Sequence, residues 1–527
     1  MKKFTLTMMM MGLLASSLSA ETVEVTTSEM NAATDGSLLK IMANIPDATP
    51  TTIEFNFDGD TLEYNTAESL GFSLLNKDIT FSGVNKKNGK NVVIKGASSF
   101  LSLGTGVTIA IDHMDFVNFG AIAFKVVDGS SLTVKNCNFK NNRDPKNESG
   151  NNGGVIRIGG GNVIVDNCLF LNNKGMGSYG GGAICLYQSS GVVPVMKVTN
   201  SSFVQNEGVS GGAIAVNVRS GKGSVPQVYI ANNTFANNTV ASRGGALYFQ
   251  TAETTGSFSP VVVNCTFVGN LNNITTSDDG GAINVWSRAT TTMTPIIINN
   301  LFAENYFDPW GTSRLNDVKA FYLKGDVSGG TEQSQTVNAV VKNNLFAAGQ
   351  DKFYTVLEAT DNNSLIDFAN SSIFAATEQN PWDEADPMYK HNTAVLEGAM
   401  KVAMISENSI AKGKGIATYT GIEIPTTDQL GNPRDASTPT VGAIEKLVTT
   451  GIDNAVINSN TLKIWANGNT IFVSGLDQST NLSIFDMTGK MIYSGNIESN
   501  SPKVVNTLNK GIYIARVNGQ SAKFAVR

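Results

Sequence analysis

Histidine is nearly absent from this chain of 527 residues, which contains only His113 and His391. A histidine-rich metal centre or a nucleophile activated by histidine is therefore not expected. Charged residues are also few, at 16%, and 38 Lys and Arg against 44 Asp and Glu give a formal net charge of −6. This balance argues against a protein that neutralises the phosphates of nucleic acid. Gly, Asn, Ser and Thr take the remaining places, and these residues favour turns and strands over long helices.

Cysteine is scarce as well, with Cys137, Cys168, Cys185 and Cys265 as the complete set. Four cysteines in a chain of this length do not make a disulfide scaffold, and without a CxxC pair no zinc site is expected. Three of the four take the same slot of a repeat, where their side chains point in parallel. Parallel side chains disfavour the dihedral angle of a disulfide, so we predict free thiols.

Long apolar runs are missing too. No stretch of about 20 apolar residues follows the start of the chain, so no transmembrane helix is predicted. Residues 1–20 read MKKFTLTMMMMGLLASSLSA, with two lysines, a short apolar run and small residues up to Ala20. This order is typical of a secretory signal peptide, and it predicts export of the mature chain.

A repeat is the main feature that the sequence does contain. Seven segments carry an apolar residue two places before an Asn and a Phe three places after it, with the Phe residues at spacings of 31, 33, 32, 32, 35 and 44: Phe139, Phe170, Phe203, Phe235, Phe267, Phe302 and Phe346. In six of them a second Asn follows the Phe by three, at Asn142, Asn173, Asn206, Asn238, Asn270 and Asn305. A Gly-Gly motif alternates with these segments: GGVI at 153, GGAI at 181, 211 and 280, and GGAL at 244.

The unit predicts short strands separated by turns. Alternating apolar positions over about five residues favour a strand, while Asn and Gly tolerate the left-handed backbone of a turn. Such a unit cannot bury its apolar face alone, but stacked units about 4.8 Å apart bury it and pair every strand with the next. We predict a right-handed parallel β-helix with an Asn ladder along one corner, formed by Asn136, Asn167, Asn200, Asn232, Asn264, Asn299 and Asn343.

The β-helix is predicted to begin before the repeat and to span residues 21–379. Residues 52–57, 79–84, 91–96 and 107–118 have strand patterns separated by turns. Residues 37–45 have helical spacing with Ser37 as an N-cap, and we expect them to cap the open end of the solenoid, with a surface helix as the alternative.

The spaced FxxN and GGA[IVL] motifs over residues 130–350 resemble the repeats of polymorphic outer-membrane proteins, a family of β-helical surface adhesins. The chain has no room for that family's C-terminal membrane barrel. Residues 380–446 contain DPMY at 386, LGNPRD at 430 and VGAIE at 441, and resemble the closing segment of secreted bacterial β-helix proteins. This resemblance implies a last rung and a cap, with Asp386, Gly431, Asn432 and Arg434 as turn and cap residues.

The tail, residues 447–527, predicts a small β-sandwich, because six or seven short strands alternate with Gly and Asn turns. The order IFDMTGKMIY, KGIYIARV and KFAV resembles the type A sorting domain of the Bacteroidetes type IX secretion system. The resemblance implies recognition by the secretion machinery at the outer membrane, then removal of the domain as the protein is attached to the surface or released.

Two outward columns follow the Gly-Gly motif. The second and fourth residues after it are apolar and face inward, so the third and fifth face outward. The outward candidates for a glycan-binding face are Tyr187, Asn217, Gln250 and Trp286 in the fifth column, Tyr248, Asn284 and Arg157 in the third, and Arg219 and Arg288 two residues beyond the fifth. Aromatic faces cover sugar rings and amides bond hydroxyls, although exposed strands also tolerate both residue types.

Catalytic residues are not identified. Glycoside hydrolysis needs two facing carboxylates, and neither column holds one. Asp278 and Asp279 edge the face but are expected to be turn residues, Asp58 and Asp60 lack the spacing of a calcium loop, and both histidines are expected to be structural. No metal or cofactor is predicted, although calcium remains possible. The sequence thus favours a secreted or cell-surface, non-catalytic adhesin-like protein that binds a polysaccharide or another host or community ligand. A polysaccharide lyase or glycoside hydrolase on the same fold is the alternative.

Overall fold

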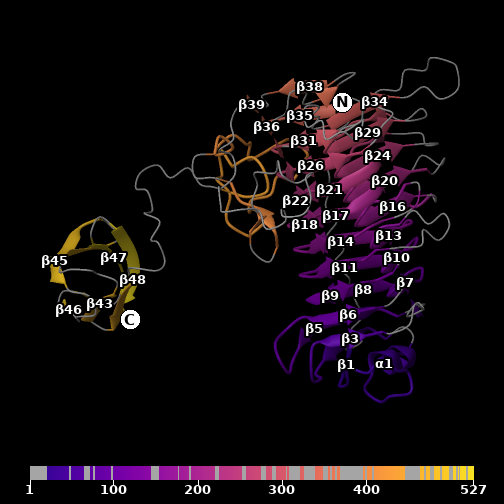
Figure 1. Ribbon diagram of the computed structural model, residues 1–527, viewed down its shortest axis with the longest axis horizontal. Helices are drawn as coiled ribbons and strands as arrows, with labels where there is room; N and C mark the ends of the chain where they lie inside the picture. The colour runs from indigo at the N-terminus through magenta and orange to yellow at the C-terminus, as the bar shows by residue number, and fades with distance from the viewer. Residues whose placement is uncertain are drawn as a thin grey trace. The chain divides into compact units, whose positions relative to one another are not determined.

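The computed structural model divides the chain into two compact units, Met1–Leu447 and Val448–Arg527, which are described separately (Figure 1). It describes residues 20–445 and 463–526, except 47–48, 65–71, 75–76, 97–98, 121, 144–152, 176, 178, 189–190, 220–224, 252–256, 274–280, 288–291, 304, 308–320, 326–338, 348–353, 356–358, 363–364, 368–395, 398–399, 406–408, 468–469, 475–479, 487–488, 498–502, 506–507, 510 and 518–519.

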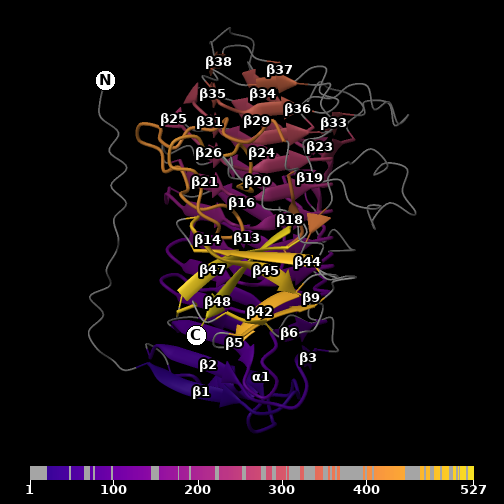
Figure 2. The same cartoon turned by 90° about the vertical axis from the view of Figure 1, so that its left-hand side faces the viewer.

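Three parallel sheets build the first unit, which confirms the parallel β-helix (Figures 1 and 2). The 12-stranded sheet runs β1 (Glu21–Val25), β2 (Thr51–Phe55), β5 (Ile79–Asn85), β8 (Thr108–Asp112), β11 (Ser131–Lys135), β14 (Asn162–Asp166), β17 (Val195–Thr199), β21 (Gln227–Ala231), β26 (Val261–Val263), β31 (Ile296–Ile298), β35 (Ala339–Lys342), β38 (Ala359–Asn362).

The 11-stranded sheet follows the corner Asn of each repeat. Its strands are β3 (Thr61–Glu63), β6 (Val92–Lys95), β9 (Met114–Val117), β12 (Asn138–Lys140), β15 (Leu169–Leu171), β18 (Ser202–Val204), β22 (Thr234–Ala236), β27 (Thr266–Val268), β32 (Leu301–Ala303), β36 (Leu345–Ala347) and β39 (Leu365–Asp367). In this sheet the repeat phenylalanines pair in register, as Phe139 with Phe170 and Phe170 with Phe203.

The 10-stranded sheet contains the strands that follow the Gly-Gly motif, and we call it the Gly-Gly sheet. Its strands are β4 (Phe72–Leu74), β7 (Leu101–Leu103), β10 (Phe124–Val126), β13 (Ile156–Ile158), β16 (Ile184–Gln188), β20 (Ile214–Val218), β24 (Leu247–Thr251), β29 (Ile283–Ser287), β34 (Phe321–Gly325) and β37 (Tyr354–Thr355).

Smaller elements flank the three sheets. Four rungs add a sheet of β19 (Glu207–Ser210), β23 (Thr239–Arg243), β28 (Leu271–Asn272) and β33 (Tyr306–Phe307), and two-stranded sheets pair β25 (Ser257–Phe258) with β30 (Thr292–Met293) and β40 (Leu396–Glu397) with β41 (Val402–Ala403). Helix α1 (Leu38–Asn44) forms where predicted, with the Ser37 side chain accepting a hydrogen bond from the Lys40 amide at 3.2 Å. Leu38 and Met42 are buried in the core with Val25 of the terminal strand β1.

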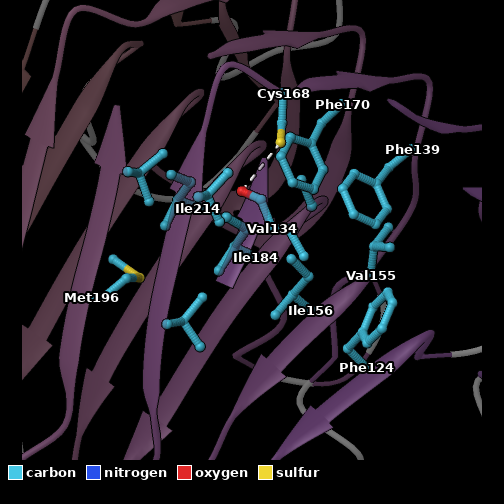
Figure 3. Packing of buried hydrophobic residues seen from close by; sticks show 14 of the residues in the cluster. Phe124, Val134, Phe139, Val155, Ile156, Cys168, Phe170, Ile184, Met196 and Ile214 are labelled. Carbon is cyan, nitrogen blue, oxygen red and sulfur yellow. Dashed lines mark hydrogen bonds between the residues drawn. The ribbon is translucent and has the colours of Figure 1, made fainter. Parts of the chain in front are cut away.

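A stack of phenylalanine rings runs through the core (Figure 3). From Phe116 to Phe346 the rings lie nearly parallel, with successive centroids 4.6–5.2 Å apart. This distance is the rung spacing of a parallel sheet, so the repeated Phe of the chain forms a continuous apolar column. All four cysteines are free and buried, which confirms the predicted thiols.

The predicted Asn corner is confirmed as a turn, but the continuous ladder is formed by the other Asn set. All seven corner residues, from Asn136 to Asn343, have positive φ between 50° and 57°. Their side-chain bonds are interrupted, since Asn167 Nδ2 donates to Asn136 Oδ1 whereas Asn200 Nδ2 donates to Asp166. The second Asn of each repeat is buried, and Nδ2 of each donates to Oδ1 of the next from Asn142 to Asn305, at 2.8–3.0 Å.

The Gly-Gly motif is required by close contact between successive rungs. A Cβ on Gly182 would overlap the carbonyl oxygen of Gly212, one on Gly212 that of Gly245, and one on Gly245 that of Gly281. Gly211 and Gly244 also have positive φ, of 77° and 69°. At 211 and 244 the first glycine therefore makes the turn, and the second admits the neighbouring backbone.

The segment predicted as last rung and cap takes a different path. Its described residues, 400–405 and 409–445, lie along the side of the solenoid (orange in Figure 1) rather than across its end. Gln429 bonds Ser202 and Thr234, while Gly442 and Ile416 bond Asn299. We call residues 409–445 the flank segment; its hydrogen bonds reach several rungs, from Ser202 to Asn299.

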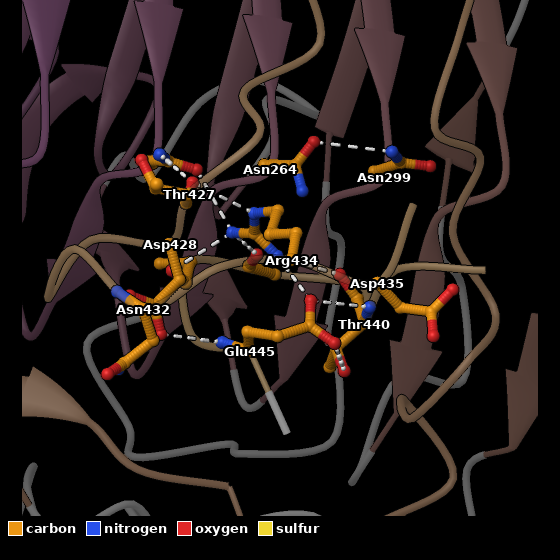
Figure 4. A network of polar contacts seen from close by, with 12 residues as sticks. Asn264, Asn299, Thr427, Asp428, Asn432, Arg434, Asp435, Thr440 and Glu445 are labelled. Atoms are coloured by element: carbon orange, nitrogen blue, oxygen red, sulfur yellow. Dashed lines mark hydrogen bonds and ion pairs between the residues drawn. The ribbon is translucent and has the colours of Figure 1, made fainter. Parts of the chain in front are cut away.

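A buried polar network holds the flank segment in place (Figure 4). Arg434 pairs with Glu445 at 3.2 Å, both side chains being 2% exposed, and also donates to Asn232 Oδ1 at 3.0 Å. Asp428 accepts hydrogen bonds from the backbone of Asn432 and Glu445. Gly431 has a φ of 84° within this turn, so Gly431, Asn432 and Arg434 are structural residues here, while Asp386 lies outside the described residues.

The second unit is a small antiparallel β domain. Its three-stranded sheet contains β42 (Lys463–Asn467), β43 (Thr470–Ser474) and β46 (Lys503–Val504), and its four-stranded sheet contains β45 (Met491–Ile497), β44 (Thr480–Phe485), β47 (Gly511–Val517) and β48 (Gln520–Val526). Ile471 and Val505 share one buried core with Leu482, Ile484 and Ala515. The two sheets pack face to face, as the sequence predicted.

Candidate functional site

The fifth-column residues stand in one register line on the Gly-Gly sheet. Tyr187 pairs with Asn217, Asn217 with Gln250, and Gln250 with Trp286. Neighbouring strands of a sheet are about 4.8 Å apart, so the line spans about 14 Å. None of the four side chains belongs to a hydrophobic core cluster, which agrees with their predicted outward direction.

Most of this line is nevertheless covered. Tyr187 is half-buried, but Asn217, Gln250 and Trp286 are only 0%, 1% and 8% exposed. The guanidinium of Arg243, from β23, lies 4.0 Å from the centre of the Trp286 ring. The sequence predicted an open strand surface; it did not show that the turns and the extra sheet fold back over the middle of the column.

The third column is buried in the same way. Tyr248 and Asn284 are 0% and 1% exposed and lie in register with each other on β24 and β29. Arg157, on β13, stays half-buried and pairs in register with Cys185 on β16 and Lys125 on β10. Of the third-column candidates, only Arg157 therefore keeps a partly open side chain.

A cluster at the open end of the column was missed by the sequence reasoning. Tyr179 lies in the turn before the Gly-Gly motif, and its ring lies 4.2 Å from the guanidinium carbon of Arg219 and 5.9 Å from the Tyr187 ring. Arg219 Nη2 donates to the Tyr179 hydroxyl, and Asn217 Nδ2 donates to the Tyr179 carbonyl at 3.2 Å. We call Tyr179, Tyr187, Asn217 and Arg219 the Tyr179 cluster. An aromatic residue directly before a repeated glycine motif was the available signal.

Several polar side-chain atoms in and beside the fifth column have no hydrogen-bond partner within the described protein. Asn217 Oδ1 and both Gln250 amide atoms are buried without a hydrogen-bond partner, and so is Arg219 Nε. Buried polar atoms usually have partners, and leaving one unpaired costs about 1–3 kcal/mol. These buried polar atoms lie beside the half-buried aromatic rings of the Tyr179 cluster, and no hydrogen bond within the described protein satisfies them.

Other candidates do not join this site. Asp58 and Asp60 pair with Lys87 and Lys90, at 2.9 and 3.7 Å. His113 occupies a corner position with a φ of 58° and its Nδ1 lies 2.9 Å from Asp112. Arg288, Asp278, Asp279, His391 and the acidic stretch 382–387 lie outside the described residues.

Within the described residues there is no group of three or more His, Cys, Asp or Glu side chains that would hold a metal ion. Burial raises the pKa of Cys185 to about 11 and that of Cys265 to about 12. A thiol is nucleophilic as the thiolate, so these two are not activated nucleophiles.

Among the residues that the structure describes, no helix combines the length and apolar character that crossing a membrane requires. No curated protein sequence matches the chain. Residues 459–527, which include every described strand of the second unit, match the family described as the secretion system C-terminal sorting domain. The chain is therefore a parallel β-helix that carries a type IX secretion sorting domain, the mark of a secreted or cell-surface protein.

Proposed function

We propose that this protein is a non-catalytic, adhesin-like surface protein whose β-helix binds glycans. Residues 1–20 serve as the signal peptide, and the sorting domain engages the secretion machinery before the protein is attached to the surface or released. In this proposal residues 21–379 form the β-helix that binds the ligand, residues 380–446 are its closing segment, and residues 447–527 are the sorting domain that directs secretion.

The register line of the Gly-Gly sheet carries the proposal. It presents aromatic and amide side chains at the spacing of successive rungs, and it begins at the half-open Tyr187. Aromatic faces stack on sugar rings, and Tyr187 is the member of the line that keeps an exposed part. Because Asn217, Gln250 and Trp286 are covered, the first sugar contacts fall on the half-buried Tyr179 and Tyr187.

The test is a binding assay of the full-length mature chain on an array of neutral and acidic polysaccharides. One aromatic face contributes on the order of 1 kcal/mol, and ~1.4 kcal/mol is a tenfold change in affinity. Tyr187→Ala is expected to weaken binding about fivefold to tenfold, and Tyr187→Ala with Trp286→Ala by tenfold or more. Tyr419→Ala, a half-buried aromatic on the flank segment, is the matched control and should change nothing.

Two results would contradict the proposal. Unchanged binding by the double variant would make the column an ordinary strand surface. Shortening of a polysaccharide by the parent chain, abolished by Arg157→Ala or Arg219→Ala, would establish a lyase on this fold instead. Because each site is expected to bind weakly, display of many copies on one surface would raise the overall avidity for a polymer.

A further inference from the structure

The Gly-Gly sheet differs in charge from the other two long sheets. None of its ten described strands contains Asp or Glu, and its charged positions are Lys125, Arg157 and Lys324. The 12-stranded sheet, by contrast, carries Glu54 and Asp166 among other acids. The chain as a whole has a net charge of −6, so the described strands of this sheet are basic in an acidic protein.

Arginines frame the sugar column on this face. Arg219 lies at the Tyr187 end, and Arg243 of β23 covers Trp286 at the other end. Arg219 is half-buried, donates to the neutral Tyr179 hydroxyl, and has a buried Nε without a partner. In the described part of the chain, no carboxylate pairs with Arg219.

The geometry of Arg219 favours an anionic ligand. A guanidinium presents a planar fork of donors that matches a carboxylate or a sulfate, and its charge is poorly compensated by an uncharged hydroxyl. Stacking between Arg219 and Tyr179 fixes the fork beside Tyr187, so a sugar lying on Tyr187 would place an acidic substituent within its reach.

We infer that the glycan bound by this sheet is anionic, with carboxylate or sulfate groups, and that Arg219 binds its acidic group while Tyr187 stacks on the ring. This inference deepens the proposed function and rests on it. Arg157, on β13 next to the Tyr187 strand β16, extends the positive face for a further acidic unit of a polymer. The acid-free strands keep repulsive carboxylates away from that path.

The experiment compares matched polymer pairs that differ only in charge, with the full-length mature chain. The pairs are polygalacturonate against its methyl ester, and dextran sulfate against dextran. We expect the charged member of at least one pair to bind tenfold or more tightly, and the pair that shows the difference identifies carboxylate or sulfate as the group. Added salt should weaken only the charged interaction.

Variants locate the effect. Arg219→Gln should reduce binding of the charged polymer tenfold or more and flatten its salt dependence, while binding of its neutral partner stays within twofold. Lys125→Gln removes the same charge from an exposed residue three strands away on the same sheet, and should change either affinity less than twofold. Arg219→Lys keeps the charge but loses the planar fork, and should fall between parent and Arg219→Gln.

Different failures have different meanings. Equal binding of charged and neutral polymers would overturn the anionic ligand and leave the proposed glycan binding in place. An equal loss in Arg219→Gln and Lys125→Gln would overturn the specific role of Arg219, because it would indicate a diffuse field. Binding to neither member of any pair, on an array where no other glycan binds, would overturn both.

Discussion

Removing one rung of the buried Asn ladder should destabilise the solenoid far more than removing a corner Asn. Asn206 Oδ1 accepts from the backbone amide and the Nδ2 of Asn173, at 3.0 and 2.9 Å. Its Nδ2 donates to the Phe170 carbonyl and to Asn238 Oδ1, both at 3.0 Å. Asn206→Ala therefore removes four hydrogen bonds and leaves their partners buried.

The expected size follows from those four bonds. Each typical hydrogen bond contributes about 1 kcal/mol net, and a buried group left unpaired costs about 1–3 kcal/mol. Admission of a water molecule would restore part of this loss, so we expect a decrease of about 3–5 kcal/mol in the unfolding free energy. Asn200→Gly is the control, because its corner side chain is half-buried and glycine adopts the positive φ without strain.

The assay is denaturant unfolding combined with amide hydrogen exchange of the rungs next to Asn206, since a solenoid opens locally. Asn200→Gly should cost about 1 kcal/mol or less. If Asn206→Ala and Asn200→Gly differed by less than about 1 kcal/mol, the buried ladder would not be the stabilising one, and the assignment of the two Asn sets would be refuted.

Three further outcomes are expected. Gly245→Ala should yield unfolded or aggregated protein, because its Cβ would overlap the next rung, whereas Gly120→Ala meets no atom within 4 Å and should fold, as judged by soluble yield and circular dichroism. The pKa of Cys185 is raised in the native state to about 11 and that of Cys265 to about 12, so their neutral thiols stabilise the fold fully below about pH 8.5. This stability is lost as the pH rises toward those values. Cys265→Ala should therefore make the unfolding free energy, measured at a series of pH values, fall less steeply above about pH 8.5. Deletion of 451–527 should leave the β-helix folded but absent from the cell surface, measured by surface labelling against the intact chain, and surface display of the truncated protein would contradict a sorting role.

The parts of the fold that recur in the chain were predictable from the sequence. Alternating apolar residues, the Asn corners and the Gly-Gly turns specify strands and turns locally, and stacking then places equal positions in register. The pattern could not show which Asn forms the continuous ladder, because both sets repeat with the same period. The two sets differ in where their side chains lie. The side chains of Asn142 and its equivalents are buried inside the solenoid, whereas Asn136 and its equivalents have a positive φ at the corner turn.

The non-repeating parts could not be placed in the same way. The flank segment was expected at the end of the stack, and its path along the side depends on contacts such as Arg434 with Asn232, about 200 residues apart in the chain. The register line was predicted correctly, yet its burial depends on Tyr179 and Arg243, which belong to a turn and to an extra strand. Local periodicity carries no information about such long-range covering contacts.

The Asn ladder also gives the solenoid an internal polarity. From Asn142 to Asn270 each Nδ2 donates to the Asn Oδ1 of the next rung as well as to a Phe carbonyl of the preceding one, and each Oδ1 after the first accepts from the preceding Asn. The series starts where the Phe119 amide donates to Asn142 Oδ1. The amide dipoles thus point the same way, and each bond polarises its neighbour. A new rung meets the same donor and the same acceptor wherever it is added, so a tandem duplication of one repeat unit can lengthen the body without redesigning either neighbour. The length of such a protein is then open to change in evolution by whole rungs, while its two ends and its sorting domain stay as they are.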